Sequence, residues 1–257
     1  MKKLLTTLLL ATLSQSALAQ NPLRISTDGA YPPFSETNEK GEMVGFDIDI
    51  GKALCEEMKR ECTFIQTEWD GLIPALTNQK IDIILASMNA NEERRKNIDF
   101  TDPYYINPGI FVRAKGSDIA LTEEGLKGKA IGVLVGSVFD DYASEKFANW
   151  AEIKRYNTQE DVSADALAGR VDVLFADKVV LEDGFLAREE GKDFEAFGDA
   201  VDDPKFFGEG ISIGIRKEDQ ELKSALNAAL KAIRENGKYK EINDKYFTYD
   251  ISGGSAK

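Results

Sequence analysis

The chain of 257 residues carries 45 acidic and 32 basic side chains and no histidine, and its net charge is −13 at neutral pH. A surface this negative repels nucleic acid and anionic lipid, so we expect neither as a partner. The absence of histidine excludes nucleophile arrangements that pair serine or cysteine with an imidazole. The length suits one large domain or two of modest size.

The first residues have the pattern of a secretory signal peptide. Met1-Lys2-Lys3 precede an apolar run from Leu4 to Leu13, and Ala17-Leu18-Ala19 forms a small-x-small cleavage signature. We expect residues 1–19 to be removed near Ala19/Gln20 and the rest to be exported to the periplasm. This run is shorter than the roughly 20 residues of a membrane-spanning helix, and no later segment approaches that length, so no membrane insertion is expected.

Up to about residue 110, short β-branched runs alternate with helix-period segments, which is typical of a mostly parallel sheet covered by helices. The first helix begins near Gly45, with Asp47 as its expected N-cap and Phe46, Ile50, Leu54 and Met58 on its apolar face. Strands are expected at 23–27, 63–66 and 81–87, and a second helix at 72–77.

The two cysteines, Cys55 and Cys62, lie seven positions apart. On an unbroken helix this spacing separates them by about 10 Å, beyond the roughly 7 Å limit for a disulfide, so a bond requires the helix to end between them. Export favours that bond. A metal site is the weaker interpretation, because two thiolates without histidine lack further ligands. We expect no metal and no cofactor.

The second half shows a comparable order, with a strand at 130–134, helices at 139–150 and 161–168, and a strand at 171–177. The string IDIILAS of residues 81–87 matches VDVLFAD of residues 171–177 in character, and RISTDG (24–29) parallels GVLVGS (132–137). We interpret these matches as a structural repeat, although two buried parallel strands can also look alike by chance.

After residue 204 the pattern predicts a strand at 211–215 and then the clearest helix of the chain, at 220–236, ended by Gly237. The apolar face of this helix needs a partner, and we expect it to return to the first half. Two crossings between the halves, near residues 106–109 and 203–209, would then form a hinge.

Ligands of open parallel sheets bind outside the carboxyl ends of the strands. The residues expected there are Asp28, Ser87 to Arg94, Gly136 to Phe139, and Asp177. In the run ending ERRK, Arg94 is predicted to point inward, suited to a bidentate carboxylate contact, and Arg95 outward. Alternatively, Arg94 pairs with Glu92, Glu93 or another surface acid.

Other residues at these strand ends have two interpretations each. Asp177 closes an apolar strand and either binds a ligand ammonium or caps the next turn. Asp28 is either an acceptor for a ligand cation or a turn residue before Gly29. Tyr31 and Trp69 ordinarily serve core packing or a lid. Gly136-Ser137, ahead of a helix, offers N–H groups to an anion, but one such loop is weak support.

These residues lie in strings that resemble the periplasmic solute-binding proteins of polar amino-acid ABC importers, particularly the lysine/arginine/ornithine and histidine group. The resemblance extends from residue 20 onward and rests on these strings: TDGAYPPF, GFDIDIGKALCEEM, WDGLIPAL, KIDIILASM with ERRK, DFTDPYY, LKGKAIGVLVGS, LAGRVDVLFAD, FFGEGISIGIRK and IRENGKYKEINDKYF.

The resemblance implies a type II, two-lobed α/β fold, in which each lobe is a mostly parallel sheet flanked by helices and two hinge crossings join them. Lobe 1 would comprise residues 20–107 and 208–257, and lobe 2 residues 108–207. Arg94 would bind the ligand α-carboxylate and Asp177 its α-ammonium. Asp28 would meet a cationic side chain between Tyr31 and Trp69. The rest of the lining is expected from Ser87, Asn89, Leu134, Ser137, Val138 and Phe139.

Some positions depart from the family pattern. Close relatives usually carry Ser or Thr at the positions of Asn89 and Asn91, a hydroxyl at that of Val138, and often a polar residue at that of Phe139. Backbone N–H donors survive the loss of a hydroxyl at 138, so carboxylate binding is compatible with it. The bulk of Asn89 and Phe139 would reshape the pocket and favour an unusual or larger ligand, such as an opine-like derivative.

The leading functional hypothesis is a soluble, monomeric, periplasmic protein that captures a cationic L-amino acid, arginine first and then lysine or ornithine, and delivers it to an inner-membrane ABC permease. The alternatives are an opine-binding protein and a periplasmic enzyme of the same fold, of the cyclohexadienyl dehydratase type. Enzymatic chemistry needs a positioned general acid. No acid–base pair stands out by spacing, so we expect no catalysis.

Overall fold

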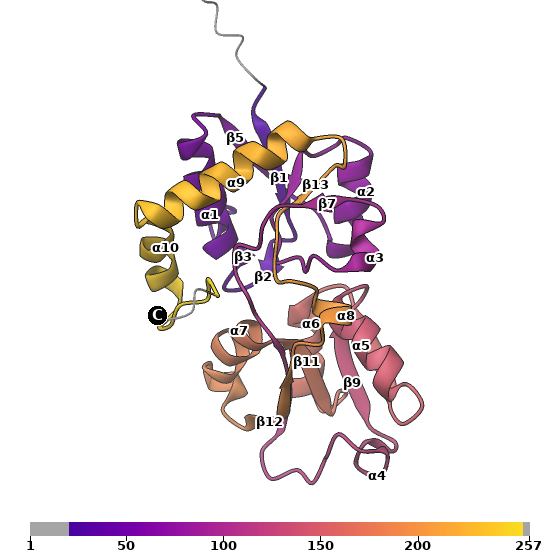
Figure 1. Ribbon diagram of the computed structural model, residues 1–257. Helices are drawn as coiled ribbons and strands as arrows, with labels where there is room; N and C mark the ends of the chain where they lie inside the picture. Colours follow the sequence, from indigo (N-terminus) through magenta and orange to yellow (C-terminus); the bar gives the residue numbers. More distant parts are fainter. Residues whose placement is uncertain (1–20, 254–257) are drawn as a thin grey trace, which may run out of the picture.

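The computed structural model describes residues 21–253, which form two lobes, one above the other in Figure 1. The first lobe contains a five-stranded sheet of order β5-β1-β6-β13-β7, and the second a five-stranded sheet of order β10-β9-β11-β8-β12. The strands of the first sheet are β1 (Leu23–Thr27), β5 (Cys62–Gln66), β6 (Ile83–Ile84), β7 (Asp99–Phe100) and β13 (Gly214–Ile215). Those of the second are β8 (Gly109–Ala114), β9 (Ala130–Leu134), β10 (Glu152–Tyr156), β11 (Val173–Asp177) and β12 (Phe194–Val201).

The two sheets repeat one another, as the matched strings predict. In each, the second strand of the sheet pairs in parallel with a neighbour on both sides: β1 with β5 and β6, and β9 with β10 and β11. The next two pairings in each sheet are antiparallel, so the sheets are mixed. Equivalent aspartates hold equivalent strands: Asp82 accepts the Arg24 N–H at 3.0 Å, and Asp172 accepts the Ala130 N–H at 2.8 Å. This repetition places the carboxyl ends of both parallel sets toward the boundary between the lobes.

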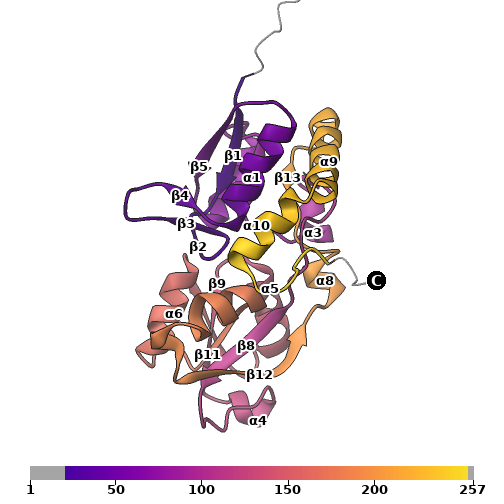
Figure 2. The ribbon, with the colours of Figure 1, turned by 90° about the vertical axis from the view of Figure 1, so that its left-hand side faces the viewer.

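Helices and a small sheet cover the two central sheets. The small sheet consists of β2 (Ala30–Tyr31), β3 (Ser35–Thr37) and β4 (Met43–Val44), which project from the first lobe in Figure 2. The helices are α1 (Phe46–Glu57), α2 (Leu72–Thr77), α3 (Glu92–Arg95), α4 (Glu123–Leu126), α5 (Val138–Phe147), α6 (Gln159–Leu167), α7 (Lys178–Leu181), α8 (Pro204–Phe207), α9 (Gln220–Glu235) and α10 (Lys238–Tyr246). Short turns of other helix types lie at Trp69–Gly71, Glu182–Leu186 and Glu189–Gly191.

The helix α9 returns to the first lobe, as predicted from its unpartnered apolar face. It packs on α1 and lies across the upper lobe in Figure 1. Leu226, Leu230 and Ile233 are buried in one cluster with Leu54 of α1. Burial of a leucine or isoleucine side chain contributes about 1.5–3 kcal/mol, so this contact ties the end of the chain to its beginning.

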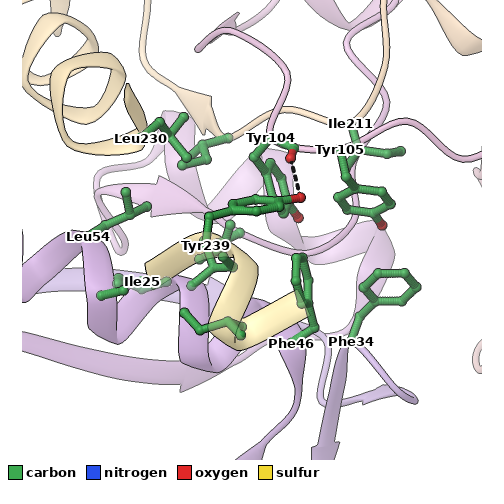
Figure 3. Packing of buried hydrophobic residues seen from close by; sticks show 14 of the residues in the cluster. Ile25, Phe34, Phe46, Leu54, Tyr104, Tyr105, Ile211, Leu230 and Tyr239 are labelled. Carbon is green, nitrogen blue, oxygen red and sulfur yellow. Dashed lines mark hydrogen bonds between the residues drawn. The ribbon is translucent and has the colours of Figure 1, made fainter. Parts of the chain in front are cut away.

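Aromatic rings pack together in the core of the first lobe (Figure 3). Phe34 stacks on Tyr105 with ring centroids 4.9 Å apart, and Phe46 stacks on Tyr104 with ring centroids 6.4 Å apart. The Tyr239 hydroxyl donates to the Tyr104 carbonyl at 2.7 Å. These contacts fix the segment between β7 and β8, which contains Tyr104 and Tyr105, against α1 and α10.

The disulfide expected from the sequence is present between Cys55 and Cys62, whose Cα atoms lie 6.2 Å apart. The helix α1 ends at Glu57, between the two cysteines, as their spacing requires. The prediction of Asp47 as the N-cap of this helix is wrong. Gly45 holds that position, and the Asp47 side chain is instead buried beneath the boundary between the lobes.

Two chain segments cross between the lobes, one between β7 and β8 and one between α8 and β13. They lie side by side, because Ile211 of the second crossing pairs with Tyr105 of the first. Within residues 21–253, no helix is long and apolar enough to cross a membrane. The expected signal peptide, residues 1–19, lies outside the described residues.

Candidate functional site

A small cavity, of about 10 Å³, lies between the two lobes, at the carboxyl ends of their parallel strands. Ten of the eleven predicted ligand-binding residues line it, and Asp28 does not. The first lobe contributes Tyr31, Trp69, Ser87, Asn89 and Arg94, and the second contributes Leu134, Ser137, Val138, Phe139 and Asp177. The sheet repeat explains this convergence, since Ser87 lies just after β6 and Asp177 is the last residue of β11, the equivalent strand of the other lobe.

Arg94 points into the molecule, as predicted, and is only 8 % exposed. Its Nη1 donates to the Asn89 carbonyl at 3.0 Å, and its Nη2 to the Gly136 carbonyl of the other lobe at 3.4 Å. The guanidinium also lies over the ring of Trp69, 5.2 Å from its centroid. Burial lowers the pKa of Arg94 to about 10, so the side chain remains charged at neutral pH.

The alternative pairing of Arg94 with a nearby acid is wrong. Among the described residues, no ion pair includes Arg94, whereas its neighbour Arg95 pairs with Asp99 at 3.5 Å. Asn91 caps the short helix α3, because its side chain accepts the Arg94 N–H at 3.0 Å. This cap sets the first turn of the helix so that consecutive arginines diverge, one toward the cavity and the other toward Asp99 and the ring of Phe100.

Asp177 lies across the boundary from Arg94 and is 2 % exposed. Its Oδ2 accepts the Tyr31 hydroxyl at 2.5 Å, while its Oδ1 is buried without a hydrogen-bond partner among the described residues. The side chain does not cap the helix that follows it, so the capping alternative is wrong. Burial raises the pKa of Asp177 to about 7, and the Tyr31 hydroxyl and the Arg94 charge oppose that rise.

Ser87 is held in a conformation that the sequence did not predict. Its backbone has φ +54°, in the left-handed region that non-glycine residues seldom occupy. Its hydroxyl donates to Asp47 at 3.1 Å, and the Tyr104 hydroxyl donates to the other Asp47 oxygen at 2.8 Å. Burial raises the pKa of Asp47 to about 7. The sequence contained one indication of these hydrogen bonds, namely that the acidic residue Asp47 lies next to the apolar face of α1.

The wall from the second lobe is formed by the start of α5. Ser137 caps this helix by accepting the Asp140 N–H at 3.2 Å. The Gly136 N–H donates to Asp140, so the helix itself uses one of the donors expected for an anion. Phe139 packs edge-on against Phe175 and Phe207, at centroid distances of 5.1 and 5.7 Å, and presents an apolar face to the cavity.

Asp28 serves the local turn. Its Oδ1 accepts the Ala30 N–H at 3.1 Å and the Ser35 hydroxyl at 2.9 Å. Burial raises the pKa of Asp28 to about 6, and the charge of Glu160 on the second lobe adds to that rise. Asp28 therefore lies at the boundary near the cavity without lining it, and the ligand contact assigned to it stays a prediction.

The amide nitrogens of Asn89 and Asn91 are already bonded. Asn89 Nδ2 donates to the Phe207 carbonyl at 3.2 Å, and Asn91 Nδ2 to the Phe206 carbonyl at 2.9 Å. The cavity thus combines a buried cation on one lobe, a buried acid on the other, and aromatic rings between them. This arrangement suits a small ligand that carries both a negative and a positive group. Among the described residues, no group of three or more potential metal ligands is present.

Comparisons with known proteins agree with this geometry. Residues 23–249 match the family described as bacterial extracellular solute-binding proteins, family 3. The L-arginine-binding protein of Pseudomonas aeruginosa is 48 % identical over 99 % of this chain and 100 % of its own length. The histidine-binding periplasmic protein of Escherichia coli K12 is 43 % identical over the same shares. An ancestral arginine-binding protein solved with arginine superposes with a TM-score of 0.81 and 32 % identity, covering 89 % of this chain and 99 % of its own.

Proposed function

The chain belongs to family 3 of the bacterial extracellular solute-binding proteins, and from this premise we propose that it binds a free cationic L-amino acid, L-arginine first and then lysine or ornithine. Arg94 grips the α-carboxylate and Asp177 accepts the α-ammonium. The other cavity residues enclose the ligand, and Asp28 meets the distal cation from the edge of the site.

One observation supports this proposal above the others. Two buried side chains of opposite charge face one cavity, and among the described residues neither forms an ion pair. Arg94 has no ion-pair partner among the described residues, and Asp177 Oδ1 has no hydrogen-bond donor. A buried charge without a partner is costly. A zwitterionic head group would satisfy both residues at once, and because they lie on different lobes it would favour the closed state.

The preference for a cationic side chain follows from the groups around the cavity. Tyr31 and Trp69 line the cavity with aromatic rings, which attract cations, and Asp28 and Glu160 contribute negative charge at the boundary. Relatives named for binding arginine, and lysine/arginine/ornithine, match nearly the whole chain, which supports the same ligand class here. We propose arginine because its planar guanidinium stacks on aromatic rings.

We further propose that the protein works in the periplasm, as a monomer that hands its ligand to an inner-membrane ABC permease. Residues 20–107 and 208–257 would move as one lobe and residues 108–207 as the other, turning about the two crossings. The relatives named as periplasmic support this location. We also propose that the ligand is bound without conversion, so incubation with prephenate or arogenate should give no product.

The decisive experiment compares Arg94→Ala with Arg95→Ala by titration calorimetry with L-arginine. Loss of the buried guanidinium should weaken binding by on the order of 3–5 kcal/mol, at least about a hundredfold in Kd, because the ligand carboxylate is left unpaired. Arg95 lies outside the cavity and its replacement should leave Kd unchanged. Near-normal arginine binding by Arg94→Ala would reject the assignment, and a thermal-shift response to acidic or apolar amino acids alone would reject the ligand class.

A further inference from the structure

The loop that carries the cavity residues of the first lobe is joined to the second crossing segment by two side-chain amides. Asn89 and Asn91 are 3 % and 4 % exposed, and their Nδ2 atoms donate to consecutive carbonyls, those of Phe207 and Phe206. The backbones also meet nearby, where the Ala90 N–H donates to the Gly210 carbonyl at 3.0 Å. The contact is therefore a buried, specific one.

The two sides of this contact belong to different lobes. Met88 and Ala90, beside the asparagines, are packed in the core of the first lobe with Ile84 of β6. Phe206 and Phe207 are packed in the core of the second lobe, where Phe207 touches Phe139 of the cavity wall. Each of these two hydrogen bonds therefore joins the two lobes, close to the point where the chain crosses between them.

The same two asparagines hold Arg94 from the other side. Asn91 Oδ1 accepts the Arg94 N–H at 3.0 Å, and the Asn89 carbonyl accepts Arg94 Nη1 at 3.0 Å. A guanidinium that grips a carboxylate must be held to within a fraction of an ångström. The position of Arg94 is thus fixed by two residues whose side-chain NH2 groups donate hydrogen bonds to the second lobe.

Gly208 permits the close approach that this contact needs. Its φ is +64°, and a Cβ at this position would lie 2.3 Å from the Ala90 carbonyl oxygen. The crossing therefore passes directly over the backbone of the loop, which brings the two preceding carbonyls within reach of the asparagine amides.

We propose that Asn89 and Asn91 are positioning residues that couple closure of the lobes to the placement of Arg94. The hydrogen bonds from their side-chain amides to α8 form when the lobes close. They then hold the Arg94 guanidinium at the correct distance from the cavity residues of the second lobe. They slow ligand release without contacting the distal end of the ligand. This inference rests on the proposed function, because it assumes that Arg94 grips the ligand.

The test variant is Asn91→Ser, because serine retains an oxygen that caps α3 and loses the donor to Phe206. Stopped-flow measurement with L-arginine should give a dissociation rate about threefold to tenfold faster, the effect of one lost buried hydrogen bond, with the association rate changed by less than about twofold. The melting temperature of the ligand-free protein should stay within about 2 °C of the wild type, since the cap is preserved. The radius of gyration of the arginine-saturated protein should be unchanged.

Arg95→Ala, on the same helix, is the matched control and should behave as wild type. Asn91→Thr, which also retains a capping oxygen and loses the donor to Phe206, should accelerate release in the same way if Asn91→Ser proves too unstable to purify. An unchanged dissociation rate in both variants would overturn the coupling while leaving the proposed function intact. A weaker affinity that merely follows a lower melting temperature would also overturn it, since the asparagines would then be structural. Failure of the wild type to bind arginine would instead reject the proposed function.

Discussion

Asp177 should make ligand binding depend on pH near neutrality. Its carboxyl is buried and its pKa is raised to about 7, chiefly by burial, although the Tyr31 hydroxyl and Arg94 both favour the charged form. A ligand ammonium requires the ionised carboxylate. Below pH 7 the bound ligand must therefore displace a proton from Asp177, and affinity should fall as the solution becomes more acidic.

The magnitude follows from proton linkage. When the free protein holds one proton that the complex does not, affinity falls by up to about tenfold per pH unit, because one pKa unit corresponds to 1.36 kcal/mol. Between pH 7 and pH 5 the loss is thus on the order of a hundredfold at most. The α-carboxyl of a free amino acid stays ionised over this range. Asp47, whose pKa is raised to about 7, does not line the cavity. Asp28, whose pKa is raised to about 6, is proposed to meet the distal cation, so its ionisation should add to the loss of affinity below pH 6.

Titration calorimetry with L-arginine between pH 5 and pH 8, in two buffers of different ionisation enthalpy, measures both affinity and proton release. The wild type should release at least about one proton per arginine near pH 6, and Asp177→Asn should bind weakly, with only the pH dependence contributed by Asp28. The same variant should be more stable than the ligand-free wild type at pH 8. The folded protein binds the Asp177 proton more tightly than the unfolded chain, whose pKa is about 3.9, so its stability is lost as pH rises through 7. Affinity that is flat from pH 8 to pH 5 would refute this reasoning.

Three further changes test the fold. Cys62→Ser should lower the free energy of unfolding by about 2–3 kcal/mol, measured by urea denaturation without reductant, because the bond to Cys55 closes a short loop in the unfolded chain. Gly208→Ala should destabilise by about 1–3 kcal/mol or more in the same assay, owing to its positive φ and the Ala90 carbonyl 2.3 Å away; a neutral result would contradict that contact. Gln159→Leu should raise the melting temperature, since both side-chain polar atoms of Gln159 are buried without partners among the described residues, and a lower value would indicate that the amide is satisfied by bound water.

Periodic segments of the sequence predicted their own structure well. The strands at 23–27 and 130–134 and the helix at 72–77 have the predicted bounds, and the helix at 220–236 ends one residue earlier. Their apolar residues repeat at a period that one secondary structure satisfies. The strands β8, β10 and β12 were not predicted, and β6 and β13 are only two residues long where longer runs were expected. A buried apolar run does not tell how much of it pairs with neighbours, because pairing depends on distant strands.

The sequence by itself determined which side chains would gather at the boundary between the lobes, because the carboxyl ends of parallel strands share an edge and a repeated unit brings two such edges together. Only the tertiary structure decided how those side chains are bonded. The Tyr31 hydroxyl reaches Asp177 across 146 positions of sequence, Asn89 reaches Phe207 across 118, and Asp28 turns to its own loop. Local pattern sets the direction of a side chain from its own backbone, whereas its partner, its burial and therefore its pKa depend on segments that become neighbours only when the chain has folded.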